Sequence, residues 1–304
     1  MEQGQVVDGW TIDEFIQKRG HSGIVARVRH ADGRKGIMKI YLPRPGFRVS
    51  RFRYEDLFAA SPIIAGFKPP HYGRGFIEGR PYFVVEEVTP LPATLPPDEL
   101  KAVLLAAIRI CYHLQLAGFY HADIKPDNMG RRADGSLVLF DFGCVLRIKK
   151  ATRYPLAAGT DYYQSPEAQH GDVSDKSEIY SLSKSGIVLA DAEGRIRFAH
   201  AFLAGTEKHP DERPKSYAAL ADLIENSEST FTDVVRLYSR IWNKVIIAAC
   251  VTVGVIAIAY GSIMAVSYMH RRDMLEKASG ELDRRGAEVD LIMKQGCKRF
   301  DSSL

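Results

Sequence analysis

Apolar and polar residues alternate along the first part of the chain and follow a helical period further on. Residues 24–30 and 35–42 each have the pattern of a strand, and the Asp32-Gly33 pair between them is typical of a tight hairpin turn. Residues 100–111 place apolar side chains three and four apart, which predicts an amphipathic helix. A strand-rich part up to about residue 90 is therefore followed by a helix-rich part, which predicts an α+β fold with two lobes.

A second feature of the pattern is an apolar run near the end of the sequence. Residues 245–269 carry no charged side chain, and Lys244 and Arg271 lie close to its two ends. As a helix this run would measure about 37 Å, more than the roughly 30 Å of a bilayer's hydrocarbon core. We therefore expect a single transmembrane helix; the alternative is a core helix, which is rarely uncharged on every face over this length. Three small residues spaced by four would let two such helices approach closely as a homodimer: Ala257, Gly261 and Ala265.

The composition narrows the classes of protein. Hydrophobic residues make up 46% of the 304 residues, which is enough to build a core and excludes intrinsic disorder. The net charge of +4 comes without a block of basic residues, so we expect no nucleic-acid partner. The 4 cysteines show no paired spacing, which argues against zinc and disulfides and favours a reducing compartment. Residues 1–8 lack the apolar core of a secretory signal.

Two polar motifs carry the candidate chemistry. The first is His121-Ala-Asp-Ile-Lys-Pro-Asp-Asn128, and the second is Phe140-Asp-Phe-Gly143, at the end of an apolar strand predicted over residues 137–140. In this order and at this separation, they closely resemble the catalytic loop and the metal-binding turn of protein kinases. The resemblance implies a two-lobed kinase fold that binds ATP and Mg²⁺.

The resemblance also implies a role for each polar residue of the two motifs. Asp123 matches the carboxylate that orients the attacking hydroxyl and accepts its proton, and Lys125 matches the cation that neutralises charge on the γ-phosphoryl oxygens. Asn128 and Asp141 match the oxygen ligands that hold Mg²⁺ against the phosphates. We therefore expect Asp123, Lys125 and Asn128 to be catalytic and Asn128 and Asp141 to bind the metal.

A glycine-containing stretch near the N-terminus supports a nucleotide site. Gly20-His-Ser-Gly23-Ile-Val25 resembles the second half of the glycine-rich loop of kinases, where backbone N–H groups approach phosphate oxygens. Lys39, further along the chain, matches the strand lysine that binds the α- and β-phosphates. We expect Gly20, Gly23, Val25 and Lys39 to contact the nucleotide.

In the kinase pattern, the strand lysine pairs with a carboxylate from a helix, and the adenine binds at the hinge between the lobes. Glu55 is the candidate carboxylate, and its neighbour Asp56 is the alternative. The stretch that contains Glu86 and Val88 resembles the strand that runs into the hinge between the lobes. The resemblance implies that backbone groups of these two residues face the adenine.

Residues 159–167 bear on the class of substrate. Their sequence, Gly-Thr-Asp-Tyr-Tyr-Gln-Ser-Pro-Glu, resembles the end of a protein-kinase activation segment, which small-molecule kinases lack. This favours a protein substrate, and Lys125 together with Thr160 resembles the serine/threonine class rather than the tyrosine class. Arg213 matches the arginine that forms a structural pair with Glu167 in this family.

Four positions depart from the family pattern and support a rival interpretation. Lys18 replaces the first glycine of the loop, Ile37 a small alanine beside the adenine, Ala122 the arginine before the catalytic aspartate, and Glu178 an aspartate that braces the catalytic loop. The rival is a pseudokinase that acts as a membrane-bound nucleotide-sensing or scaffold module. Because every group that the transfer itself requires is present, we expect an active, membrane-anchored serine/threonine kinase.

The resemblance and the apolar run together predict the domain organisation. We expect a protein kinase domain at residues 9–226, a juxtamembrane linker at 227–244, the transmembrane helix at 245–269 and a short charged tail at 270–304. ATP is cytosolic, so we expect the kinase domain on the cytoplasmic side. The greater number of Lys and Arg residues just after the apolar run favours the opposite orientation, and we give the ATP argument more weight.

Overall fold

The structure is a computed structural model that describes residues 1–20, 23–43, 45, 48–148, 160–227 and 229–241, together with Met264 and Met269. Its contacts divide the chain into two units, Met1–Leu237 and Tyr238–Leu304. The sheet, the helical part and the candidate site all belong to the first unit.

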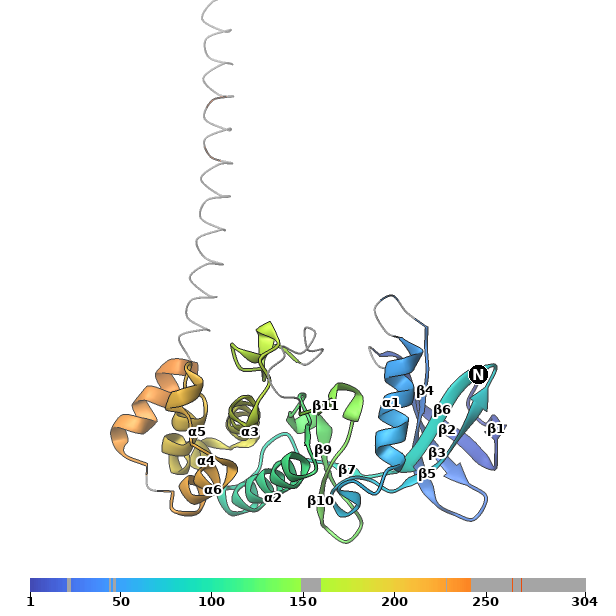
Figure 1. Cartoon of the computed structure of the whole chain (residues 1–304), viewed down its shortest axis with the longest axis horizontal. Coiled ribbons are helices and arrows are strands. Elements are labelled where there is room, and N and C mark those ends of the chain that lie inside the picture. The colour runs from blue at the N-terminus through green and yellow to red at the C-terminus, as the bar shows by residue number, and fades with distance from the viewer. Residues whose placement is uncertain are drawn as a thin grey trace, which may run out of the picture. The chain divides into compact units, whose positions relative to one another are not determined.

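The N-terminal part of the first unit is an antiparallel sheet of six strands (Figure 1). Their spatial order is β1-β2-β3-β4-β6-β5. The strands are β1 (Val6–Val7), β2 (Trp10–Gly20), β3 (Gly23–His30), β4 (Lys35–Ile40), β5 (His71–Ile77) and β6 (Arg80–Glu86). The hairpin predicted at Asp32-Gly33 is confirmed, since β3 and β4 pair directly across that turn.

The two faces of this sheet have different surroundings, because side chains on a strand point alternately to either side. In β4, Met38 and Ile40 are fully buried in a core shared with Trp10 and Val28, whereas Lys39 points to the opposite face. That face is covered by helix α1 (Val49–Ala60), whose Phe52 lies against Phe83 of β6 with ring centroids 5.3 Å apart. The alternation in β4 therefore separates a hydrophobic core from a face that carries a charged side chain.

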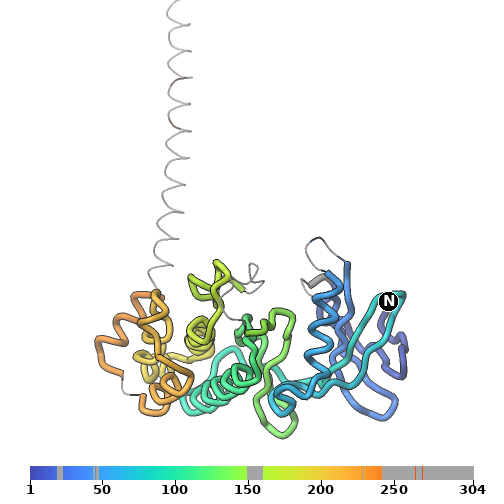
Figure 2. Tube along the Cα trace, in the orientation of Figure 1, coloured from blue at the N-terminus to red at the C-terminus, as the bar shows by residue number. Residues whose placement is uncertain are grey.

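The C-terminal part of the first unit is mainly helical, and Figure 2 follows the chain into it from β6. Its long helices are α2 (Pro97–Leu116) and α3 (Asp175–Leu189). Three shorter helices follow: α4 (Ala192–Arg197), α5 (Ala199–Gly205) and α6 (Tyr217–Glu225). The predicted α+β architecture is confirmed.

Short strands and 3₁₀ turns make up the other elements, and two of the turns carry the ends of the two motifs. The strands are β7 (Thr89–Pro90), β8 (Phe119–Tyr120), β9 (Met129–Arg131), β10 (Leu137–Leu139) and β11 (Leu146–Arg147). The turns are η1 (Ala65–Phe67), η2 (Pro126–Asn128), η3 (Phe142–Cys144), η4 (Ala168–His170) and η5 (Pro210–Glu212). Because β9 pairs with β10, the end of the first motif lies beside the start of the second.

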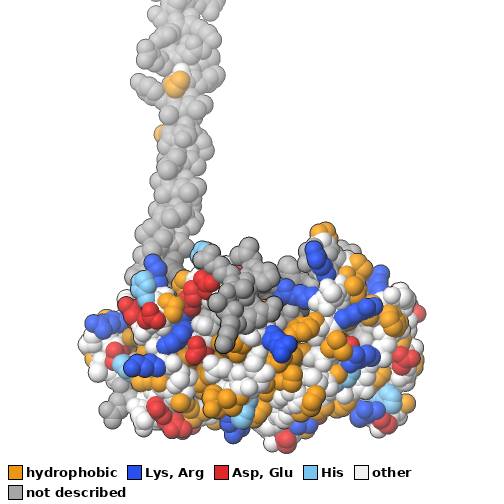
Figure 3. Space-filling view, viewed as in Figure 1, with side chains coloured by type: hydrophobic (Ala, Val, Ile, Leu, Met, Phe, Trp, Pro, Cys, Tyr) orange, Lys and Arg blue, Asp and Glu red, His pale blue; other side chains and the backbone are white. Residues whose placement is uncertain are grey.

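The membrane prediction falls almost entirely on residues that the structure does not describe. Within the described residues, no helix combines the length and the apolar character needed to span a bilayer. The predicted span at residues 245–269 lies outside them apart from Met264 and Met269, and the tail at 270–304 lies outside them altogether. The homodimer predicted through this span is likewise outside the described residues. Over the first unit, Figure 3 shows side chains of both charges interspersed with apolar ones.

Candidate active site

A pocket of about 1000 Å³ lies between the sheet and the helical part and contains most of the predicted site. Several predicted residues line it: Val25, Lys39, Glu55, Glu86, Val88, Asn128 and Asp141. Asp123 and Lys125 do not line the pocket, but they lie beside it through contacts with Asn128 and with each other. Gly20 and Gly23 are not among the lining residues.

The lysine of β4 joins the two parts of the site. Lys39 Nζ donates to Glu55 Oε1 of α1 at 2.6 Å and to Asp141 Oδ1 of the second motif at 2.9 Å. The alternative partner, Asp56, instead accepts from His71 Nε2 at 2.9 Å when that nitrogen carries the proton. The structure therefore brings together the three residues predicted from distant parts of the sequence and assigns the helix carboxylate to Glu55.

Burial and mutual attraction set the charges of this cluster. Burial and the neighbouring Asp141 carboxylate raise the pKa of Glu55 to about 7, against the attraction of Lys39. The pKa of Asp141 lies at about 2, because its ion pair with Lys39 outweighs burial. The two carboxylates also outweigh the burial of Lys39 and raise the pKa of its ammonium. Two carboxylates that share one cation thus have pKa values pushed apart, as expected of coupled acids.

The second motif, predicted to bind the metal, forms a turn with a backbone conformation that few residues adopt. Asp141 has φ of 59°, in the left-handed region, which directs its carboxylate toward Lys39. A Cβ on the following Gly143 would lie 3.2 Å from Glu55 Oε2, so glycine leaves room for the cluster. Phe142 is buried between Phe58 of α1 and His121, with ring centroids 4.9 Å and 5.1 Å away.

Asp123 is held by the side chains around it. Its Oδ2 accepts from Asn128 Nδ2 at 3.0 Å and lies 2.9 Å from Lys125 Nζ. Its Oδ1 accepts from the backbone N–H and the hydroxyl of Thr160 at 3.0 Å and 3.1 Å. Lys125 Nζ also donates to the Thr160 hydroxyl at 2.7 Å. The carboxylate of Asp123 therefore has its orientation fixed by three residues of the catalytic loop and the activation segment.

Glu178 of α3 fixes the backbone of the predicted catalytic loop. Glu178 Oε1 accepts from the N–H groups of His121 and Ala122 at 2.6 Å and 3.0 Å. Its Oε2 accepts from Tyr217 Oη at 2.7 Å. Ala122 has a left-handed φ of 63°, a strained conformation that these bonds stabilise. Burial raises the pKa of Glu178 to about 7. Glutamate thus reaches the loop in place of the shorter aspartate of the family pattern.

The oxygen atoms available at Asn128 and Asp141 suit a magnesium ion. Because the amide nitrogen of Asn128 donates to the backbone oxygen of Asp123 at 2.7 Å, its carbonyl oxygen is directed away from that bond. Lys39 donates a hydrogen bond to Oδ1 of Asp141. Asn128 and Asp141 both line the pocket. Carboxylate and carbonyl oxygens are the ligands that Mg²⁺ prefers, usually completed by phosphate and water. The donor set therefore fits the predicted metal.

One backbone group of the predicted hinge is used within the protein. The Glu86 N–H donates to Pro70 O at 2.8 Å, so this group is engaged within the protein. The Glu86 side chain turns toward Arg132, whose Nε lies 2.6 Å from Oε2. These contacts fix the edge of the pocket where Glu86 and Val88 both line it.

The glycines of the predicted phosphate loop pair with each other across the β2–β3 hairpin. Gly23 has φ of 124°, and a Cβ there would lie 2.4 Å from Ile40 O of β4. This close approach to a neighbouring strand is a structural reason for glycine at this position. Residues 21 and 22, between the two glycines, lie outside the described residues.

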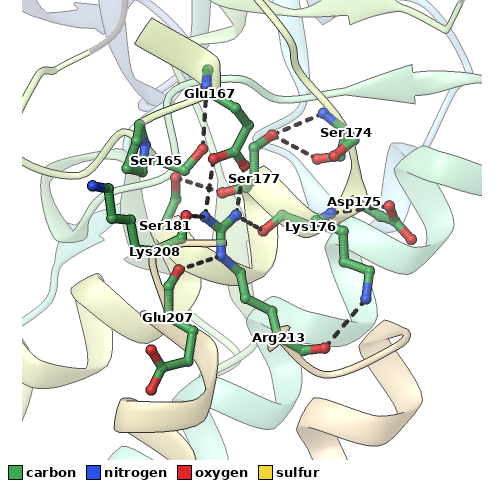
Figure 4. Close-up of polar contacts among 12 residues, drawn as sticks. Ser165, Glu167, Ser174, Asp175, Lys176, Ser177, Ser181, Glu207, Lys208 and Arg213 are labelled. Carbon is green, nitrogen blue, oxygen red and sulfur yellow. Dashed lines mark hydrogen bonds and ion pairs between the residues drawn. The ribbon is translucent and has the colours of Figure 1, made fainter. Parts of the chain in front are cut away.

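The end of the activation segment is fixed by the predicted arginine pair (Figure 4). Arg213 donates to both carboxylate oxygens of Glu167, at 2.5 Å and 2.9 Å. Its remaining N–H groups reach the carbonyl oxygens of Lys176, Glu207 and Lys208. Burying an arginine requires that its donors be satisfied, and these five bonds do so. Residues 149–159 of the segment lie outside the described residues.

Three residues of the site carry no sequence signal of the kind that revealed the others. Lys68 donates to the last carbonyls of α1, Arg51 Nε donates to Gly143 O at 2.6 Å, and Tyr217 completes the Glu178 network. None belongs to a motif, and an isolated lysine, arginine or tyrosine is usually a surface or core residue. The chain's folding alone brings them to the site.

Comparison with known proteins supports the resemblance to protein kinases. Residues 85–238 match the model of the protein kinase domain. The chain is 28% identical over 254 residues to the probable serine/threonine-protein kinase PknB of Corynebacterium glutamicum, an alignment that covers 73% of this chain and 37% of that protein. It is 33% identical over 196 residues to the membrane-associated tyrosine- and threonine-specific cdc2-inhibitory kinase wee-1.3 of Caenorhabditis elegans, covering 60% and 28% of the two chains. The chain thus spans about a third of the length of these relatives.

Proposed function

Since the chain belongs to the protein kinase family, we propose that it is a serine/threonine protein kinase that transfers the γ-phosphoryl group of ATP to a protein hydroxyl. The observation that carries this proposal is the contact of Lys39 with both Glu55 and Asp141 at 2.6 Å and 2.9 Å. In kinases, this ion pair and the metal-binding aspartate must both be in place before transfer proceeds. All three side chains are in contact across the pocket here, as an active enzyme requires.

The residues around the pocket divide the work of the transfer among them. Lys39 holds the α- and β-phosphates by charge, and Glu55 keeps the lysine extended toward them. Asp123 accepts a hydrogen bond from the attacking hydroxyl, aligns it and takes its proton, while Lys125 beside it neutralises charge on the moving phosphoryl group. When bound at Asn128 and Asp141, Mg²⁺ supplies positive charge to the phosphate oxygens.

The activation segment supports a protein substrate with serine or threonine as its acceptor. Thr160 joins that segment to the catalytic loop through hydrogen bonds to Asp123 and Lys125. The Glu167–Arg213 pair then holds the end of the segment against the helical part. A segment held at both points supplies a platform beside Asp123 on which an extended peptide can lie.

The test uses the purified full chain with labelled ATP, Mg²⁺ and a library of peptides that contain one serine, threonine or tyrosine each. The proposal requires phosphoserine or phosphothreonine, abolished by Asp141→Ala and preserved by Asp134→Ala in the exposed turn between β9 and β10. Nucleotide binding without any transfer would instead support the pseudokinase alternative. Transfer to tyrosine alone would contradict the serine/threonine assignment.

We also propose that residues 245–269 anchor the chain in a membrane as a single span, with the kinase domain on the cytoplasmic side. The support is the absence of charge over this run and the need of the domain for cytosolic ATP. Protease added to intact spheroplasts should remove the tail at 270–304 and spare the kinase domain. Digestion of the kinase domain with the tail protected would show the reverse orientation.

A further inference from the structure

Lys68 is a buried lysine that the proposed transfer does not use. It follows the η1 turn and is only 3% exposed. Its ammonium donates to the carbonyl oxygens of Phe58, Ala59 and Ser61 at 2.5, 2.8 and 2.7 Å. A lysine ammonium has three N–H donors, so each donor of Lys68 has one backbone acceptor.

All three acceptors lie at the C-terminal end of α1. The last carbonyl groups of a helix have no partner within the helix and must find one elsewhere. Many helices solve this with a left-handed glycine, but α1 is followed by Ser61 in an extended conformation, with φ of −69° and ψ of 158°. A cation at this end also interacts favourably with the helix dipole. Ser61 itself donates its N–H and its hydroxyl to Phe58 O. Lys68 adds a further donor at that oxygen and extends the cap to the carbonyl groups of Ala59 and Ser61.

The same turn of α1 sets two contacts of the active site. Glu55 lies three residues before Phe58, and its carboxylate meets Lys39. The Phe58 ring packs against Phe142 of the metal-binding turn and against Phe119, with centroids 4.9 Å and 5.2 Å away. A shift of this turn would therefore move Glu55 and release Phe142 together.

Lys68 is also tied to the hinge side of the pocket. It is followed by Pro69 and Pro70, which restrict the backbone, and Pro70 O accepts the Glu86 N–H at 2.8 Å. Lys68 and Pro69 both line the pocket. A short, stiff segment thus links the hinge strand to the end of α1 with Lys68 as its point of attachment.

We propose that Lys68 is a positioning residue that fixes α1 so that Glu55 stays paired with Lys39. This role in transfer rests on the proposed kinase function, whereas the capping of α1 does not. The Arg51–Gly143 hydrogen bond fixes the other half of the helix, so α1 is held at both ends by side chains. The helix then keeps its position without a phosphate on the activation segment, in keeping with Ala122 at the position where the family has an arginine.

The first test does not depend on catalysis. Hydrogen exchange is measured on the full chain for Lys68→Met and for Lys101→Met, since Lys101 Nζ donates in the same way to Glu225 O at the end of α6. Lys68→Met should raise the exchange rates of α1 amides by about tenfold or more, and Lys101→Met should leave α1 unchanged. If Lys68→Met does not fold, Lys68→Gln, which keeps two N–H donors, takes its place. Unchanged α1 exchange in the substituted protein would overturn the capping role.

The second test asks whether Lys68 acts through Glu55. The turnover number kcat is compared for Lys68→Met, Glu55→Gln and the double variant, at saturating ATP. Each single change should lower kcat by about tenfold, and the double variant should lie within about twofold of Glu55→Gln, because both remove the same pairing. Losses that multiply, or a Lys68→Met variant with normal kcat, would overturn the positioning role. A wild-type chain with no transfer but with the predicted exchange result would sink the kinase proposal and leave the cap intact.

Discussion

The catalytic loop and the hairpin that covers the pocket are held in different ways. In the loop, Asp123 and Asn128 are bonded to each other, and Glu178 braces the backbone from α3. In the β2–β3 hairpin, the ordering comes from strand pairing and from Gly23, which lies against the backbone of β4. Side-chain networks demand particular residues, whereas backbone pairing demands only a compatible conformation.

The departures from the family pattern occur in both regions. Lys18 lies in the hairpin, whereas Ala122 and Glu178 lie in the catalytic loop and its brace. The match to the kinase domain begins at residue 85, and the hairpin with its Lys18 lies before it. Lys39 and Glu55 also lie before it, but their contact with Asp141 connects them to the matched part. The predicted catalytic and metal-binding residues therefore lie in the matched part, and Lys39 connects them to the part before residue 85.

Lys39→Met removes that connection and should have the largest effect of the changes directed at this comparison. Without the ammonium, the phosphates lose a cation and Glu55 loses its partner, so kcat/KM should fall by about 10²-fold or more. Nucleotide affinity, measured by calorimetry, should weaken as well. Unchanged affinity and turnover would mean that the part before residue 85 does not contribute to catalysis.

Gly23→Ala tests whether backbone geometry is what holds the hairpin. The new Cβ would meet Ile40 O at 2.4 Å on a backbone with φ of 124°, so we expect a loss of about 3 kcal/mol in the free energy of unfolding. Gly33→Ala is the matched control: its φ is 92°, but a Cβ there meets no atom within 4 Å. It should cost about 1 kcal/mol. Denaturant unfolding that gave equal costs would contradict the close-approach explanation.

Glu178→Gln tests the brace of the catalytic loop through its pH dependence. The pKa of Glu178 is raised in the fold, so its contribution to stability is present below its unfolded value near 4.5 and is lost as pH rises through about 7. Between pH 4.5 and 7 this loss is on the order of 2–3 kcal/mol. Glutamine keeps an oxygen for the two N–H groups and does not titrate. The difference in unfolding free energy between variant and wild type should therefore grow in favour of the variant as pH rises; a difference independent of pH would contradict the assignment.

Much of this site was predictable because its residues occur in order along short motifs. Asp123, Asn128 and Asp141 could be placed in one site from their spacing, and the two lobes from the change of period near residue 90. The choice between Glu55 and Asp56 could not, since neighbouring helix residues differ only by the rotation of α1 against the sheet.

Other features depend on contacts that leave no pattern in the sequence. Lys68 is a single lysine between a turn and two prolines, and only the folded chain brings it to the end of α1. The sequence predicts that Gly23 contacts a phosphate. The structure gives a second reason for glycine at this position, because the backbone oxygen of Ile40 lies too close for a Cβ atom. The Glu86–Pro70 hydrogen bond is another such contact, because it joins the end of β6 to the residue just before β5. Such tertiary contacts override what a local pattern can indicate.

The central claim, that this is an active kinase, is tested most directly by Asp123→Asn in the full chain. The change keeps the shape of the side chain and removes its charge and its proton acceptor. Phosphate transfer should fall by about 10²-fold or more, roughly 3 kcal/mol in the barrier, with ATP affinity by calorimetry unchanged, because Asp123 does not line the nucleotide pocket. If Asp123→Asn transfers phosphate at the wild-type rate, the catalytic assignment is wrong.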